Sequence, residues 1–291
     1  MIHVLTQWGF DLVSSRGIFW LCVAYTFAVV TLIWMIGLFQ TDHSMMDGYY
    51  GFGYAVPVWI AYGLSGAASQ TAALLLFMAS LHGVRLGIYL SRRWIGYKRK
   101  TGGGDQRYMG FVKKLSPGYW WKSFFLVMEP QAIVIIVIGL PAVWGVLANT
   151  APGSGPLDWL SFLGMAVFGC GYYFETVADG QLQAFKADTN NRGRYLRTGV
   201  WTHTRHPNYF GNTVVWWGIW LVAVAGNPHV WWTVAGPLFN TIMLTRILGR
   251  AFQDKFMGSR PAYQKVMAET NGFLPIPKRR VGANRQDSPA A

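Results

Sequence analysis

Charged side chains are scarce in this sequence, and acidic ones are scarcer than basic ones. Charged residues make up 13% of the 291 residues, hydrophobic residues make up 52%, and the mean hydropathy is +0.24. The surface of a water-soluble globular protein needs far more charge than this composition supplies. The scarcity therefore excludes a soluble domain and predicts an integral membrane protein.

Cysteine is also nearly absent, which excludes the kinds of site that are built on it. Cys22 and Cys170 both fall in apolar runs, so neither a disulfide nor a zinc site is expected. No spacing of His, Asp and Glu indicates another metal site. The glycine run at 102–104 matches neither GxGxxG nor GxxxxGK[ST], so we predict a turn there and no Rossmann-type phosphate loop.

Long apolar runs are abundant instead, and a membrane span needs about 20 such residues. We predict an all-α integral membrane protein with seven transmembrane helices in one domain, followed by a polar tail at 278–291. The first run lacks the basic start and the cleavage site of a signal peptide, so we expect it to remain as a span. The predicted spans lie at about 18–39, 52–68, 71–91, 123–148, 156–178, 209–226 and 229–248.

Basic residues collect in particular loops, and this pattern predicts the orientation. Lys and Arg crowd the loops at 92–122 and 186–205 and the segment after Arg246. Because short basic loops stay in the cytoplasm, we expect the N-terminus outside and the C-terminus in the cytoplasm. The net charge of +13 fits this topology with anionic lipid, and equally an anionic cofactor. No nucleic-acid-binding module is present, and no obligate protein partner is indicated.

Four ionisable residues stand inside the predicted spans, where burial is costly unless the charge is partnered or faces water. His82, Arg85 and Tyr89 are three and four residues apart, so they share one side of the third helix. Glu175 and Asp179 share one side of the fifth. We expect these residues to line a polar cavity in the inner half of the protein, or to form ion pairs between helices. The four ionisable residues are Arg85, Glu129, Glu175 and Asp179.

The segment GVWTHTRHPNYFGN, residues 199–212, combines basic and amide side chains directly before an apolar run. Pro207 suits the first turn of a helix that begins near Asn208, and the free N–H groups there suit an anion. Two amides four residues apart suit a carboxamide or a ribose, and an aromatic ring one turn later can flank a flat ligand. A capped helix start with an interfacial tryptophan is the alternative. The candidate contacts are Arg205, His206, Asn208, Asn212 and Trp216.

A longer pattern extends this segment on both sides. It comprises Asp179, Lys186, Arg194, Thr198, Gly199, Arg205–Tyr209, Gly211, Asn212 and Trp216. With the runs RLGIYLSRR at 85–93 and RPAY…FLPIP at 260–277, it resembles the steroid 5α-reductase family and its bacterial relatives. The resemblance covers the third helix and most of the chain over about 123–277, and it is specific over 175–216. The first two helices match only loosely.

The resemblance implies a seven-helix membrane enzyme that uses NADPH to reduce the C=C bond of a steroid-like enone, such as a 3-oxo-Δ4 steroid. Steroid, sterol, polyprenol and enoyl-lipid substrates stay open, and so does the preference for NADPH over NADH. On the family's pattern the cofactor-facing positions are Tyr89, Asp179, Lys186, Arg194, Asn208, Asn212, Trp216 and Arg250. The neighbouring candidates are Arg93, Arg197, Arg205, His206 and Asp254.

Catalysis of this kind requires a donor that polarises the enone carbonyl. The family's carbonyl donor is a tyrosine in the third helix, and His82 falls at that position here. The family's acidic partner precedes the AVP run at 55–57, where this chain has no glutamate. The chain instead offers Tyr49, Tyr50 and Asp47, with Asp42 nearby.

Two other functions fit parts of the same sequence. Membrane methyltransferases that act on isoprenylcysteine or phospholipids share the RHP-x-Y turn and bind S-adenosylmethionine. Their pattern carries a Glu-Glu pair after the last helix, whereas this chain has Asp254 and Lys255. A seven-helix transporter would also use charges inside the membrane, but it needs polar residues in the outer halves of its spans. Few are present there, so the reductase is the preferred prediction.

Overall fold

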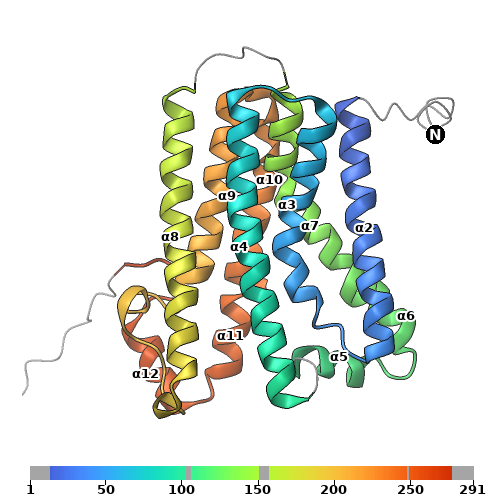
Figure 1. Cartoon of the computed structure of the whole chain (residues 1–291). Coiled ribbons are helices and arrows are strands. Elements are labelled where there is room, and N and C mark those ends of the chain that lie inside the picture. The colour runs from blue at the N-terminus through green and yellow to red at the C-terminus, as the bar shows by residue number, and fades with distance from the viewer. Residues whose placement is uncertain (1–13, 103–105, 151–156, 248, 277–291) are drawn as a thin grey trace, which may run out of the picture. The chain divides into compact units, whose positions relative to one another are not determined.

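The computed structural model describes residues 14–102, 106–150, 157–247 and 249–276, and within these ranges the regular structure is helical (Figure 1). The β-type pairing described in them is the isolated bridge between Thr204 and Asn271. The chain divides into two compact units. The first unit contains Met1–Phe168 and Trp216–Phe239, and the second contains Gly169–Val215 and Asn240–Ala291. The prediction of a single domain stays a prediction. The predicted polar tail and most of the predicted glycine turn lie outside the described residues.

Five of the described helical segments are long and apolar enough to cross a membrane, which confirms an all-helical protein with membrane-spanning character. The first unit carries α2 (Ser15–Gln40), α4 (Gln70–Thr101) and a continuous segment of α6 (Tyr119–Ser123), a π-helical turn η1 (Phe124–Met128) and α7 (Glu129–Ala148). The other two spans are α8 (Trp159–Ala187) and α9 (Pro207–Gly226), which contribute residues to both units.

The two remaining predicted spans are helical but do not meet the same criterion. The segment at 52–68 corresponds to α3 (Met46–Ser65), whose glycines, tyrosines and Asp47 make it less apolar. The segment at 229–248 is divided into a 3₁₀-helical part η4 (Pro228–Val234), α10 (Ala235–Ile242) and a π-helical turn η5 (Met243–Ile247). Seven spans and the orientation of the termini therefore stay predictions.

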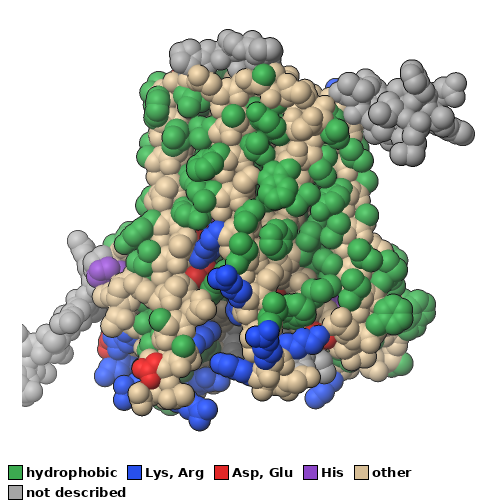
Figure 2. Space-filling model, in the orientation of Figure 1, with side chains coloured by type: hydrophobic (Ala, Val, Ile, Leu, Met, Phe, Trp, Pro, Cys, Tyr) green, Lys and Arg blue, Asp and Glu red, His purple; other side chains and the backbone are tan. Residues whose placement is uncertain are grey.

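Helices α2, α3, α4 and α7 of the first unit lie side by side (Figure 1). Their outer faces expose large apolar side chains such as Phe39 and Phe77, as expected of surfaces that face lipid (Figure 2). Local signals set the helix ends. Ser14 caps α2 by accepting a hydrogen bond from the Gly17 amide, and Ser69 caps α4 by accepting one from the Ala72 amide.

Glycines bring α3 and α4 into backbone contact. A Cβ added to Gly51 would lie 2.1 Å from the Gly87 amide nitrogen and 2.3 Å from the Gly83 carbonyl oxygen. Small residues at such positions are the usual means by which membrane helices approach closely. The absence of a side chain at Gly51 is thus a condition for the packing of the first unit.

Glycines also allow α8 and α9 to pack closely within the second unit. A Cβ on Gly171 would lie 2.7 Å from the Gly211 carbonyl oxygen, and one on Gly211 would lie 2.4 Å from the Glu175 amide nitrogen. Because the two backbones touch, side chains one turn away on either helix lie within hydrogen-bonding distance of the partner helix. This packing sets the geometry of the polar residues described below.

The rest of the second unit joins the end of α8 to the last described helices. After α8 come two short 3₁₀ turns, η2 (Thr189–Asn191) and η3 (Gly199–Trp201), and after η5 come α11 (Arg250–Met257) and α12 (Pro261–Glu269). The Asn271 amide donates to the His203 carbonyl oxygen at 3.2 Å, and the Arg205 amide donates to the Asn271 carbonyl oxygen at 3.0 Å. The chain after α12 is thus bound to the turn that precedes α9.

We expect Gly51→Ala to lower the melting temperature of the detergent-solubilised protein, because the new methyl group overlaps the α4 backbone and overpacking costs about 1–3 kcal/mol or more. Gly63→Ala is the matched control in the same helix. A Cβ at Gly63 meets no atom within 4 Å, so this variant should be as stable as the parent or slightly more stable. Equal melting temperatures for the two variants would contradict the described α3–α4 packing.

Candidate functional site

Buried carboxylates and amides form a hydrogen-bonded ladder in the second unit. The Asn208 side-chain amide donates to Asp179 Oδ1 at 3.1 Å, and the Asn212 amide donates to Glu175 Oε1 at 3.2 Å. Asn240 of α10 donates in turn to Asn212 Oδ1 at 3.0 Å. Glu175 and Asp179 are nearly inaccessible to solvent. We call these five residues the amide ladder.

The amide ladder provides hydrogen-bond donors for Glu175 and Asp179, the two acids that share one side of α8. The sequence did not indicate which groups would meet these acids. Amide N–H groups donate to both carboxyl groups, and these hydrogen bonds help to hold the two acids between two largely apolar helices. A buried carboxylate needs such donors because its desolvation is otherwise very costly. The bonds also fix the orientation of Asn208 and Asn212, the two residues expected to recognise a carboxamide or a ribose.

A run of exposed basic residues follows the ladder along α8. Lys186 lies on the last turn of α8, and Arg192 and Arg194 follow the η2 turn. Arg197, the next in the run, forms an ion pair with Glu269. Guanidinium and ammonium groups in this setting suit phosphate groups.

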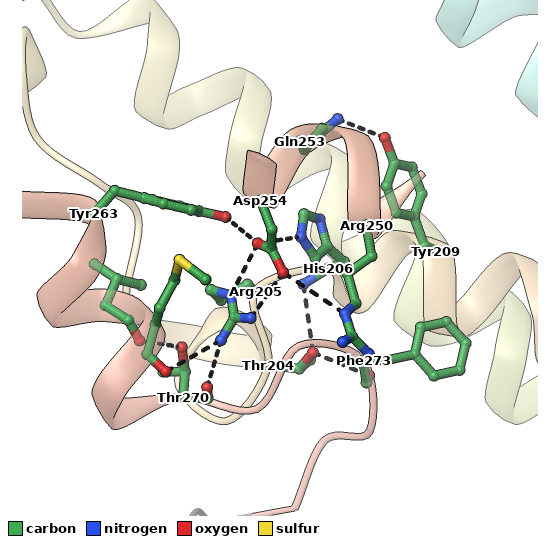
Figure 3. Close-up of polar contacts among 12 residues, drawn as sticks. Thr204, Arg205, His206, Tyr209, Arg250, Gln253, Asp254, Tyr263, Thr270 and Phe273 are labelled. Atoms are coloured by element: carbon green, nitrogen blue, oxygen red, sulfur yellow. Dashed lines mark hydrogen bonds and ion pairs between the residues drawn. The ribbon is translucent and has the colours of Figure 1, made fainter. Parts of the chain in front are cut away.

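A second polar cluster surrounds Asp254, and we call it the Asp254 clamp (Figure 3). Arg205 donates from Nε to Asp254 Oδ1 at 3.2 Å and from Nη2 to Oδ2 at 2.8 Å. The Tyr263 hydroxyl donates to Oδ1 at 2.7 Å, and His206 Nε2 lies 3.4 Å from the same oxygen. Arg250 Nε lies 3.6 Å from Oδ2. The clamp consists of Arg205, His206, Arg250, Asp254 and Tyr263.

Arg205 also binds the chain that follows α12. Its Nη1 donates to the carbonyl oxygens of Thr270 at 2.6 Å and of Met267 at 3.4 Å. Most of the N–H groups of this buried guanidinium are therefore engaged within the protein. The contacts indicate that Arg205 and Asp254 hold the last described segment against the start of α9, and direct cofactor contact by either stays a prediction.

His206 and Tyr209 extend the clamp along α9. Their rings stack with centroids 5.2 Å apart and planes 6° apart, and the Tyr209 hydroxyl accepts a hydrogen bond from Gln253 of α11 at 2.5 Å. Figure 3 shows both side chains facing α11. The RHPNY motif is thus joined to α11 at three positions, Arg205, His206 and Tyr209.

Charge and burial set the protonation states of the clamp. Burial would raise the pKa of Asp254, but the hydrogen bonds from His206, Arg205 and Tyr263 outweigh it and hold the pKa well below its usual range. Burial also lowers the pKa of His206, against the opposing effect of Asp254. The clamp therefore pairs a carboxylate with an arginine beside a neutral histidine at pH 7.

In the first unit, two of the predicted catalytic residues lie in a third polar cluster. The Tyr108 hydroxyl lies 3.0 Å from Asp47 Oδ1 and 3.3 Å from Gln131 Oε1, and Arg93 forms an ion pair with Asp47 at 2.9 Å. Tyr50 donates to Gln131 Oε1 at 3.2 Å. Sequence reasoning singled out Asp47, Tyr50 and Arg93. It missed Tyr108 and Gln131, which no motif marks.

Tyr49 points elsewhere. It is buried, and its hydroxyl lies beside Tyr25 and Thr26 of α2. Adjacent residues on a helix face different directions, so Tyr49 and Tyr50 do not act on the same group. Asp47 and Tyr50 are joined through the shared partners Tyr108 and Gln131, whereas the Tyr49 hydroxyl lies beside α2.

His82, the fourth predicted catalytic residue, lies in an aromatic cluster of the first unit. Its ring is fully buried, with the centroid of Trp216 5.7 Å away and that of Tyr54 6.3 Å away. Tyr54 and Trp216 meet edge to face at 4.8 Å. Trp216, the residue expected to flank a flat ligand, is fully buried in this cluster.

The other ionisable residues of the spans have local partners. Arg85 lies over the Tyr89 ring at 5.3 Å, and Glu129 accepts a hydrogen bond from Thr31 at 3.1 Å. In the described residues no group of three or more His, Cys, Asp and Glu could hold a metal ion.

The family model described as "Protein of unknown function (DUF1295)" matches residues 33–270, so the chain belongs to this family. The match begins within α2 and ends at Thr270, and it therefore includes the amide ladder, the Asp254 clamp and the Asp47 cluster. No curated protein and no solved structure matches the chain.

We expect the Asp254 clamp to weaken as the pH falls. Folding lowers the pKa of both Asp254 and His206, so their stabilising contribution is complete above about pH 6.5, declines below it, and declines further below about pH 4. Hydrogen exchange of residues 270–276, expressed as protection factors across this range, measures the loss. Protection that does not change with pH would contradict this expectation.

Asp254→Asn should remove the decline in protection of residues 270–276 that is expected below about pH 4. It should also reduce their protection already at pH 7, because removing one partner of a buried ion pair costs about 3–5 kcal/mol. Asp188→Asn is the control, since Asp188 is exposed and accepts only from nearby groups such as the Asn190 amide.

Proposed function

We propose that this DUF1295 protein is a membrane reductase that uses NADPH to reduce the C=C bond of a lipid-soluble enone, with 3-oxo-Δ4 steroids as the first substrates to test. The observation that carries the proposal is the amide ladder together with the exposed basic residues at the end of α8 and directly after it. The association of the family with steroid 5α-reductase-like proteins and the motif from Asp179 to Trp216 support it.

The chemistry of the second unit fits a phosphate-bearing dinucleotide. Asn208 and Asn212 present oriented amides, which suit the carboxamide or ribose end of such a cofactor. Lys186 lies seven residues beyond Asp179, about 10 Å along the helix at 1.5 Å per residue, and Arg192 and Arg194 follow it. In this proposal these three cations bind the phosphates, while the amide ladder holds the uncharged end.

The contacts of Asp254 favour a reductase over a methyltransferase. A carboxylate at that position of a membrane methyltransferase contacts the cofactor, for which it needs free acceptor atoms. Both oxygens of Asp254 are engaged with Arg205, and Tyr263 donates to one of them. A carboxylate held in this way is poorly placed to accept from the ribose or amine of S-adenosylmethionine.

When bound, NADPH supplies the hydride that is added to the β-carbon of the enone. The protein must then polarise the enone carbonyl and deliver a proton to the α-carbon. We assign carbonyl polarisation to His82, because an imidazole ring carries an N–H donor. Tyr50 and Asp47 share the Gln131–Tyr108 hydrogen-bond cluster, and we assign proton delivery to this cluster.

The proposal is tested by titrating detergent-purified protein with NADPH, NADH and S-adenosylmethionine while following quenching of its 15 tryptophans. We expect saturable binding of NADPH, weaker binding of NADH and none of S-adenosylmethionine. Asn208→Ala and Asp179→Ala should each weaken NADPH binding at least about tenfold, since each removes the hydrogen bond that orients Asn208 on Asp179. Asp188→Ala, an exposed acid beyond the same helix, should bind as the parent does. Quenching by S-adenosylmethionine alone would overturn the proposal.

We expect His82→Phe to bind NADPH with parental affinity and to reduce enone turnover by about 100-fold or more, because the carbonyl donor is lost while the ring contacts with Tyr54 and Trp216 persist. The measurement is the loss of nicotinamide absorbance with a 3-oxo-Δ4 steroid. Tyr49→Phe is the control, since its hydroxyl lies beside α2. An unaltered rate in His82→Phe would remove His82 from the mechanism.

A further inference from the structure

Helices α5 (Gln106–Leu115) and α6 of the first unit carry an exposed surface that the proposed reaction does not use. It combines aromatic and basic side chains, and we call it the α5–α6 collar. Between residues 92 and 122 the sequence contains nine Lys and Arg and a single acid, Asp105. Basic side chains gather around this end of α4 and α5 (Figure 2). The collar consists of Phe111, Lys113, Lys114, Trp120, Trp121 and Lys122.

The aromatic residues of the collar are exposed. Trp120 and Trp121 are 64% and 46% exposed, and Phe111 is 40% exposed. The Lys122 ammonium lies 5.8 Å from the centroid of the Trp121 ring and donates to the Pro117 carbonyl oxygen at 2.7 Å. Exposed tryptophan beside lysine is typical of a surface at the level of lipid headgroups, where the ring meets hydrocarbon and the cation meets phosphate.

Tyr108 of α5 faces the interior of the first unit. Tyr108 is 6% exposed, and its hydroxyl lies within hydrogen-bonding distance of Asp47 and of Gln131. Lys113 and Lys114 lie on the exposed part of the same helix. One short helix thus joins a basic outer surface to the cluster that contains Asp47 and Tyr50.

We propose that the α5–α6 collar binds the headgroups of anionic phospholipids, and that this binding holds Tyr108 against Asp47 and Gln131. Charge complementarity selects the partner. Lysines and arginines far outnumber acids around the collar, so an anionic surface is attracted to it while a zwitterionic one is not. The lipid composition then determines how firmly the Asp47 cluster is ordered. This inference does not depend on the reductase proposal.

The test compares the full-length protein in nanodiscs of phosphatidylcholine alone with nanodiscs that contain one quarter phosphatidylglycerol. Hydrogen exchange is followed in residues 106–115 and in residues 46–52 at the start of α3. We expect exchange in both segments to slow by about tenfold in the anionic discs, because each lysine near an anionic surface adds to the attraction. Equal exchange rates in the two kinds of disc would overturn the proposal.

Three variants distinguish the effect of the collar's lysine charges from the effect of the Tyr108 contact with Asp47 and Gln131. Lys113→Gln with Lys114→Gln should abolish the difference between the discs in both segments. Lys255→Gln with Lys265→Gln removes the same charge from exposed positions of the second unit and should preserve it. Tyr108→Phe should keep lipid-dependent protection of 106–115 but lose that of 46–52. If the Lys113/Lys114 variant keeps the full difference, the collar is not the lipid site.

Soluble anions test whether the collar binds lipid headgroups specifically or any phosphate group. Inorganic phosphate or NADPH, added to discs of phosphatidylcholine alone, should leave the exchange of 106–115 unchanged. Protection by either one would identify the collar as a site for soluble anions and would overturn its assignment to lipid. The exchange readout needs no enone turnover, so a failed reductase assay leaves this test intact.

Discussion

Two carboxylates buried between apolar helices are the constraint on which the second unit depends. Glu175 and Asp179 can stay inside only if N–H donors reach them, and these donors come from the side chains of α9. The donors reach them because Gly171 and Gly211 let the two backbones touch. A larger residue at either glycine would separate the helices and leave the acids without their amides. The same two glycines therefore allow the close packing of α8 and α9 and the hydrogen bonds between their side chains.

The amide ladder and the Asp254 clamp, the two polar clusters of the second unit, differ in the kinds of groups that they bring together. In the Asp254 clamp a cation, an anion and a hydroxyl satisfy one another, and the result is a firm attachment of the chain after α12 to the start of α9. In the amide ladder the side-chain amides of Asn208 and Asn212 donate to carboxylates of α8, and an exposed lysine and exposed arginines follow it. Of the two clusters, the ladder is better suited to a ligand and the clamp to holding the ladder's surroundings in place.

Much of this arrangement could be predicted from the sequence. The apolar runs predict the helices, and the spacing of Glu175 and Asp179 predicts that they share one side of α8. That the amides after Pro207 donate to these two acids does not follow from the sequence. The division of 228–247 into three short pieces does not follow from apolar length, because Pro228 and Pro237 interrupt a run that is otherwise apolar. Tyr108 and Gln131 could not be singled out either, since each is a single polar residue that only tertiary folding brings to Asp47. The hydrogen bonds that occupy the Asp254 carboxylate likewise come mostly from residues distant in the sequence, which no local spacing reveals.

The Asp254 clamp also bears on how the chain reaches its fold during synthesis. Arg205 leaves the ribosome 49 residues before Asp254, and Tyr263 and Thr270 follow later still. Throughout that interval the guanidinium has neither its carboxylate nor its carbonyl acceptors, so it must stay in water or at the headgroup level. Insertion of α9 can begin, but the turn before it cannot take its final conformation until α12 has been made. The second unit is therefore completed only after nearly all of the described chain has been translated.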